Sequence, residues 1–180
     1  QDLAAIDGLH EALCAQGFGV LSLFVASLKE DDAAHFVRDT LRANQVAVVV
    51  NTTAFSARIG TENESPLDAA GVPVLQAALS SADREAWEAS SRGLGAADLA
   101  MNVVLPEVDG RLFVGAVSFK RQETLDERHE YARVVHAPDP ANLRHVAVAA
   151  ARWAALATMP NAEKSLALVL PDYPGKVGRA

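Results

Sequence analysis

Polar side chains follow two of the predicted buried strands, at the point where each strand ends. Asn51-Thr52-Thr53 comes directly after the apolar run 46–50, and Gln76 lies near the end of the next run. Open α/β sheets bind ligands at the carboxyl ends of their strands. Amide and hydroxyl groups there can hydrogen-bond a ligand's carboxylate or amide groups, so we take Asn51, Thr52, Thr53 and Gln76 as candidate substrate-binding residues. A simpler alternative is that Asn51 and Thr52 only cap a turn.

Two other groupings carry titratable side chains. Glu107 and Asp109 flank a turn and could act as a carboxylate pair, although acidic residues on turns are usually solvated. His129, Glu130 and His136 are the densest histidine and carboxylate grouping, but their spacing matches neither ligands one helical turn apart nor a compact zinc knuckle. We therefore predict no resident metal.

A phosphate-binding loop is not predicted. Gly175-Lys176 suggests one, but the eight-residue motif needs glycine at position 170 and Ser or Thr at position 177. Leu170 and Val177 stand there instead, and no glycine-rich Gly-x-Gly-x-x-Gly segment opens a helix. We expect this chain not to bind ATP itself.

Composition narrows the class of protein. The chain has 180 residues, 50% of them hydrophobic, which suits one globular domain or two small lobes. A net charge of −7 argues against a nucleic-acid partner. No apolar run approaches the roughly 20 residues of a membrane helix. The single cysteine, Cys14, is expected in the core and fits a reducing cytoplasm.

Helical and strand patterns alternate along the chain. Capping residues and apolar periodicity predict helices over 3–17, 31–41, 81–92 and 139–159. Continuous apolar runs predict strands over 19–25, 46–50, 72–77, 112–119 and 166–170. The stretch 101–105 and the strand 112–119 surround turn residues, so we expect them to form a hairpin.

This alternation predicts an α/β fold with a largely parallel layered sheet and flanking helices. A flavodoxin-like or periplasmic-receptor-like lobe with an added β-hairpin fits the pattern. A shift in composition near Lys120 divides the chain into an α/β lobe (1–120), a charged excursion or linker (121–137) and a helix and strand of an adjoining lobe (138–180). The absence of an initiator methionine and the final loop suggest a piece of a longer protein.

Several stretches together resemble the large subunit of cobaltochelatase (the CobN type) and, more distantly, the H subunit of magnesium chelatase. They are VVVNTTAFSAR at 48–58, LDAAGVPVLQ at 67–76, DLAMNVVLPEVDGR at 98–111, AVSFK at 116–120 and AARWAALATMPNAEKSLALVLPDYPGKVGR at 150–179. The last stretch is the most specific. The resemblance covers nearly all of the chain from about Gly19 onward, and residues 121–135 match least.

The resemblance implies cobalt insertion into hydrogenobyrinic acid a,c-diamide, a corrin-type tetrapyrrole, in aerobic cobalamin biosynthesis in the cytoplasm. Co²⁺ would be the substrate metal. ATP and Mg²⁺ would be used by two partners, an AAA+ ATPase subunit and its companion, and not by this segment, which alone would be inactive. The resemblance assigns no catalytic residue here.

Two alternatives remain open on the sequence. One is a magnesium chelatase H-type subunit acting on protoporphyrin. The other is a non-catalytic lobe that binds a small molecule or only positions other domains, and the residues alone support it equally well.

Overall fold

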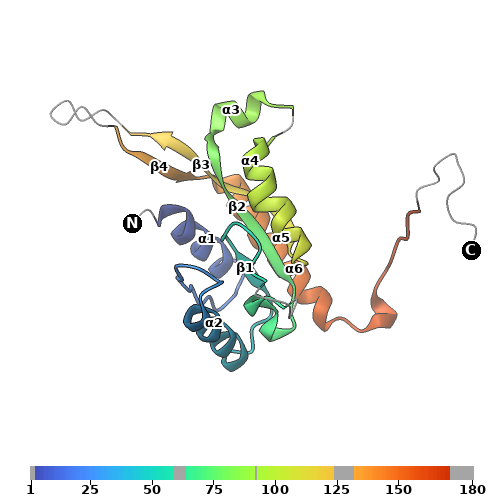
Figure 1. The fold of residues 1–180 in the computed structure, drawn as a ribbon. Helices are drawn as coiled ribbons and strands as arrows, with labels where there is room; N and C mark the ends of the chain where they lie inside the picture. Colours follow the sequence, from blue (N-terminus) through green and yellow to red (C-terminus); the bar gives the residue numbers. More distant parts are fainter. Residues whose placement is uncertain (1–2, 59–63, 92, 124–131, 171–180) are drawn as a thin grey trace, which may run out of the picture.

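A four-stranded sheet lies at the centre of the fold within the described residues, which are 3–58, 64–91, 93–123 and 132–170 of a computed structural model (Figure 1). The strands are β1 (Val49–Asn51), β2 (Val74–Asp83), β3 (Leu112–Gln122) and β4 (Val134–Pro138). They lie in sequence order; β1, β2 and β3 are parallel, and β4 is antiparallel to β3.

Helices surround this sheet. The α-helices are α1 (Ala4–Cys14), α2 (Asp31–Ala43), α3 (Arg84–Ala89), α4 (Ala96–Leu99), α5 (Leu105–Val108) and α6 (Pro140–Thr158). The π-helix η2 (Ala100–Val104) joins α4 to α5, so the three form one continuous helix over 96–108. Two short 3₁₀ helices are η1 (Pro66–Ala70) and η3 (Asn161–Glu163).

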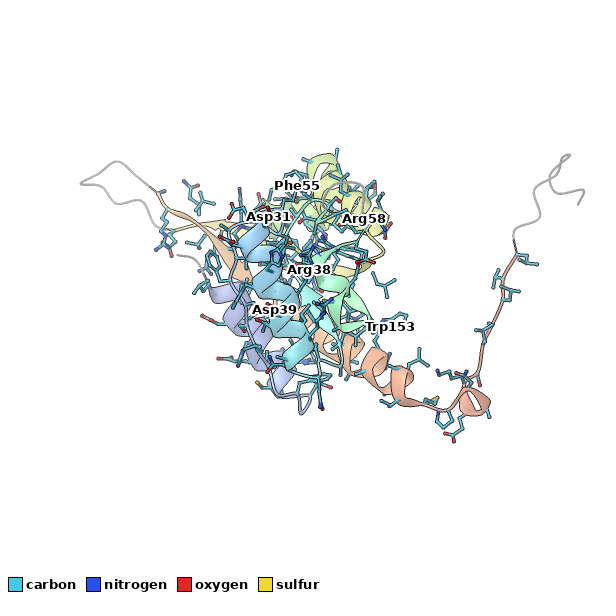
Figure 2. All side chains as sticks on the ribbon, turned by 60° about the horizontal axis from the view of Figure 1, so that its bottom comes forward. Asp31, Arg38, Asp39, Phe55, Arg58 and Trp153 are labelled. Carbon is cyan, nitrogen blue, oxygen red and sulfur yellow. The ribbon has the colours of Figure 1, made fainter. Side chains whose placement is uncertain are left out.

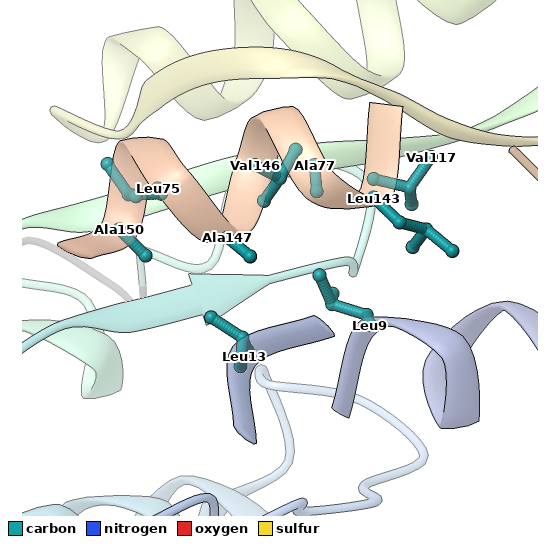
Figure 3. Close-up of a cluster of buried hydrophobic side chains, with 9 residues drawn as sticks. All are labelled: Leu9, Leu13, Leu75, Ala77, Val117, Leu143, Val146, Ala147 and Ala150. Carbon is teal, nitrogen blue, oxygen red and sulfur yellow. The ribbon is translucent and has the colours of Figure 1, made fainter. Parts of the chain in front are cut away.

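Helices α1 and α6 share one apolar core with one face of the sheet (Figure 3). The buried members are Leu9, Leu13, Leu75, Ala77, Val117, Leu143, Val146, Ala147 and Ala150. Neighbouring strand residues point to opposite faces, so Ala78 and Ala116 face the other side. There they pack with Leu94 and Phe119.

A second core lies under α2. Val37 and Leu41 of α2 pack against Leu67 of η1, Val74 of β2 and Ala57 of the segment that follows β1. This core holds the loop after β1 close to the sheet, which is where the candidate binding residues lie.

The predicted start of the last helix is confirmed. Asp139 is the N-cap of α6, and its side chain accepts a hydrogen bond from the backbone N–H of Asn142 at 2.8 Å. Pro140 is the first helical residue, where its missing N–H costs nothing.

The alternating α/β fold with a mostly parallel sheet is confirmed, but two predicted strands are wrong. Residues 19–25 contain no strand, and residues 101–105 lie in η2 and α5. The predicted hairpin is therefore misplaced, because the antiparallel partner of β3 is β4. The buried residues of this segment recur every three to four positions, which is the period of a helix and not of a strand. They are Asp98, Asn102, Pro106 and Asp109.

Residues 166–170 do not form the predicted buried strand. Leu166, Leu168, Val169 and Leu170 are 76–87% exposed and pair with no strand in the described part of the chain. Figure 1 shows this segment leading away from the sheet. The division into lobes at residues 120 and 137 stays a prediction, although α6 shares a core with α1.

Smaller differences concern single side chains. Cys14 is exposed instead of buried, and Phe36 of α2 is 52% exposed. Among the described residues, no helix is long and apolar enough to cross a membrane.

Leu75 tests the core. Its side chain is fully buried between α1 and α6, so we expect Leu75→Ala to lower the free energy of unfolding by about 2–5 kcal/mol. Leu166→Ala is the matched control, because that side chain is 87% exposed and its loss changes stability by less than about 0.5 kcal/mol. Urea unfolding followed by far-UV circular dichroism measures both, and equal effects would contradict this core.

Candidate functional site

Three of the four candidate binding residues meet at the end of β1. The Asn51 side-chain amide donates to Gln76 Oε1 at 2.7 Å and to the Thr53 carbonyl at 2.9 Å. The Gln76 amide donates to the same carbonyl at 3.1 Å, and the Thr53 hydroxyl donates to Asn51 Oδ1 at 3.0 Å. Gln76 is fully buried and Asn51 nearly so, so their polar groups bind one another and the loop.

A bulge in β3 lies next to Gln76. Gln76 pairs with Phe113, whereas Ala77 pairs with Gly115, so β3 has one extra residue at this point. Gly115 has φ +138, a conformation that side chains with a Cβ rarely adopt. Bulges re-aim neighbouring side chains, and this one adjoins the polar cluster.

Arg111 joins the cluster from the residue before β3. One guanidinium nitrogen donates to Gln76 Oε1 at 3.3 Å and to the Thr53 carbonyl at 3.5 Å. The other donates to Asp109 Oδ2 at 3.0 Å, which makes a buried ion pair. The side chains of Arg111 and Asp109 are 2% and 0% exposed.

Burial lowers the pKa of Arg111. The charge of Asp109, its hydrogen bond and the charge of Asp68 each oppose that shift in part. Arg111 Nε is buried without a hydrogen-bond partner among the described residues. The Asp109 carboxylate therefore provides most of the charge compensation for the buried guanidinium of Arg111.

Asp109 also fastens the segment after β1, residues 51–58, which we call the 51–58 loop. Its Oδ1 accepts from the Ser56 hydroxyl and its Oδ2 from the Ala57 backbone N–H, both at 2.6 Å. Arg58 Nε lies 3.7 Å from Oδ1. One carboxylate thus connects the loop to the start of β3.

The π-helix supplies another attachment. The Leu105 N–H donates to the Ala100 carbonyl, one residue further back than in an α-helix. Residue 106 is proline and has no N–H to donate to Met101 in that register. The Met101 carbonyl accepts instead from the Phe55 backbone N–H at 2.8 Å. Because Pro106 has no N–H, the Met101 carbonyl stays available to accept the hydrogen bond from the loop.

Two side chains of this fastened loop reach the surface. Phe55 is 53% exposed and has φ +67, a left-handed conformation that is unusual for a large aromatic residue. The Arg58 side chain is 30% exposed. Figure 2 shows both beside the yellow-green helix 96–108, apart from Trp153 on α6.

The remaining sequence candidates lie outside this cluster. Thr52 is half-buried and makes no side-chain hydrogen bond within the described ranges. Glu107 is exposed, but Asp109 is buried, so the expectation of a solvated turn is wrong for Asp109. His136 lies 3.2 Å from the Ser118 hydroxyl, whereas His129, Glu130 and residues 171–180 fall outside the described residues.

Sequence reasoning missed Arg111 and did not connect Asp109 to the loop. The two residues are 58 and 52 positions from their partners Thr53 and Ala57, and no local pattern shows such pairings. The signal available was a charged Asp-Gly-Arg segment directly before a buried strand.

A hollow of about 460 Å³ lies between α3 and the β3–β4 hairpin. Arg84, one of the cations in its lining, forms ion pairs with Glu88 and Asp139 and lies 5.1 Å from the Trp87 ring centroid. These contacts give Arg84 a structural role. No group of three or more metal-ligating side chains occurs in the part of the chain that the structure describes.

The fold and the cluster define a layered α/β protein that presents a fixed loop supported by buried polar groups. The chain belongs to the CobN/Magnesium Chelatase family, whose sequence model matches residues 1–180.

Two relatives agree with this assignment, and a solved structure shares the fold. The chain is 43% identical to the aerobic cobaltochelatase subunit CobN of Pseudomonas aeruginosa over 94% of its length, and 38% identical to that of Sinorhizobium sp. over 97%. It spans 14% of the length of each. The catalytic subunit of cobaltochelatase from Mycobacterium tuberculosis shares the fold over 91% of this chain, with a TM-score of 0.70 and 24% identity.

Asp109→Asn tests the ion pair. Without the carboxylate charge, Arg111 is left as an uncompensated buried cation, so we expect the free energy of unfolding to fall by about 3–5 kcal/mol. Glu107→Gln removes an exposed carboxylate two residues away and should cost less than about 0.5 kcal/mol. Urea unfolding at pH 7 measures both, and a loss below about 1 kcal/mol for Asp109→Asn would show that the pair is dispensable.

Proposed function

We propose that this chain is a segment of the tetrapyrrole-binding large subunit of an ATP-dependent cobaltochelatase. The observation that carries the proposal is the family match over residues 1–180, together with 43% identity to a relative named as an aerobic cobaltochelatase subunit. The shared fold with a cobaltochelatase catalytic subunit supports the same placement.

The proposed reaction inserts Co²⁺, the substrate metal, into hydrogenobyrinic acid a,c-diamide in cobalamin biosynthesis in the cytoplasm. It is a ligase reaction that forms metal–nitrogen bonds. ATP and Mg²⁺ are used by an AAA+ ATPase subunit and its companion, and this segment alone is inactive. Metal insertion displaces protons from ring nitrogens and needs a base, which we assign to no residue of this chain.

Within this proposal, the 51–58 loop contributes a wall of the tetrapyrrole site. Asn51, Thr52, Thr53 and Gln76 were chosen as direct contacts, and that role stays a prediction. The hydrogen bonds among Asn51, Thr53 and Gln76 favour a supporting role for these three residues, in which they fix the loop backbone for side chains that reach the surface.

Two other functions remain, and one observation separates each from the first. A magnesium chelatase H-type subunit would act on protoporphyrin, but the two relatives described above are named for cobalt. A scaffold lobe would need no ligand, but a largely buried polar cluster under a fixed, partly exposed loop is costly for a spacer.

A titration tests the proposal. We expect the complete polypeptide that contains this segment to bind hydrogenobyrinic acid a,c-diamide with a Kd of roughly micromolar order, and protoporphyrin at least about tenfold more weakly. Tryptophan fluorescence quenching and the shift of the ring's absorbance report binding. Tighter binding of protoporphyrin would favour the magnesium branch, and binding of neither ring would overturn the proposal.

The same titration with Asn51→Ala separates a binding wall from a scaffold. Loss of the Asn51 amide removes the hydrogen bonds to Gln76 and Thr53, so we expect a several-fold weaker Kd with the fold retained. Asn44→Ala, which removes an exposed amide at the end of α2, is the control. Unchanged affinity in both variants would support the scaffold, and capture of the ATPase subunits by the segment would then show what it positions.

A further inference from the structure

The 51–58 loop holds an aromatic and a cationic side chain three residues apart at the surface. We propose that Phe55 and Arg58 contact the tetrapyrrole directly, with the Phe55 ring packed against the macrocycle and Arg58 paired with a peripheral carboxylate. This inference rests on the proposed function and names the residues that would carry it.

The loop backbone is fixed from several directions. The Thr53 carbonyl accepts from three side chains, those of Asn51, Gln76 and Arg111. The Phe55 N–H donates to η2, and the Ala57 N–H donates to Asp109. Ala57 itself is 2% exposed in the core under α2. Side chains on a preorganised loop lose little entropy when a ligand binds.

Phe55 has an unfavourable backbone conformation and an exposed ring. A residue with a Cβ at φ +67 is strained, and glycine or asparagine would fit that position better. Burial of the ring does not explain the choice, because 53% of Phe55 is exposed. Strain that surrounding contacts maintain at an exposed site points to function.

The neighbouring helix also exposes apolar side chains. Phe55 is bonded through its backbone to Met101 of η2, and Val104 and Val108 on that helix are 55% and 61% exposed. Asp98, Asn102 and Pro106 form the buried side of the same helix, so the two valines lie on its outer side. A flat macrocycle presents this kind of apolar face, and aromatic rings pack on it.

Arg58 supplies the charge that the rim of such a ring requires. Asp109 contacts two guanidinium groups, and Arg111 is closer, at 3.0 Å against 3.7 Å for Arg58. Arg58 is also the more exposed of the two. Arg58 keeps its ion pair with Asp109, and a ligand carboxylate would be a further partner at the exposed part of its side chain. Guanidinium and carboxylate form paired, charge-assisted hydrogen bonds.

Phe55→Gly is the most informative variant in the complete polypeptide. Glycine relieves the strain at φ +67, so thermal stability should hold or rise, while the Kd for hydrogenobyrinic acid a,c-diamide should rise about tenfold. A residue with only a structural role would not combine these two effects. Phe36→Gly is unsuitable as a control inside α2, so Phe36→Ala serves, at a matched exposure of 52%, and should leave the Kd unchanged.

Arg58→Ala tests the carboxylate contact. We expect about tenfold weaker binding of hydrogenobyrinic acid a,c-diamide and little change for the fully amidated ring, which has no carboxylate to pair. Arg144→Ala removes an exposed cation from α6 and should change neither Kd.

The outcomes separate this inference from the proposed function. Wild-type protein that binds neither ring overturns both. Wild-type binding that Phe55→Gly and Arg58→Ala leave intact overturns only the contact residues. Should those variants keep their affinity for the ring but lose capture of the ATPase subunits, the loop is a protein-docking element and the inference is wrong.

Discussion

The buried pair between Asp109 and Arg111 is the constraint on which the rest of the site depends. Arg111 is almost fully enclosed, and a guanidinium in that position is tolerated only with a close carboxylate and further acceptors. Asp109 provides the carboxylate, and Gln76 and the Thr53 carbonyl provide the acceptors. Because one of those acceptors, the Thr53 carbonyl, belongs to the 51–58 loop, the loop cannot move away without taking an acceptor from the buried cation.

Pro106 imposes a second constraint of a different kind. A proline inside a helix removes one N–H, and here the helix accommodates it with a π-turn instead of a break. The carbonyl of Met101 is thereby left without a donor in its own helix and accepts a hydrogen bond from elsewhere. Phe55 supplies it at 2.8 Å. The loop is thus hydrogen-bonded to the helix at the Met101 carbonyl and to the ion pair at Asp109.

Much of the fold could be predicted from the sequence, because local signals dominate where they are strong. Asp139 and Pro140 define the start of α6, and the run 46–50 indicates a strand that overlaps β1. The stretch 101–105 was misassigned because a short apolar run is compatible with strand and helix, and only its tertiary partners decide. Residues 166–170 have a strand-like pattern, but no neighbouring strand in the described chain pairs with them.

The candidate site was predictable only in part. Residue type and position along the chain indicate which residues are candidates, but not what their side chains contact. Asn51 and Gln76 are candidates because open α/β sheets bind ligands at the carboxyl ends of their strands. Gln76 in fact lies inside β2, and the sequence does not say whether such groups bind a ligand or one another. Here they bind one another, so exposed contacts must come from residues that the cluster supports. Phe55 is one of them, and its type gives no hint of a positive φ, because that conformation is imposed by bonds from Asp109 and Met101 on either side of the loop. The buried polar groups therefore determine which side chains face the solvent. A ligand would contact those side chains and not the buried network that holds them.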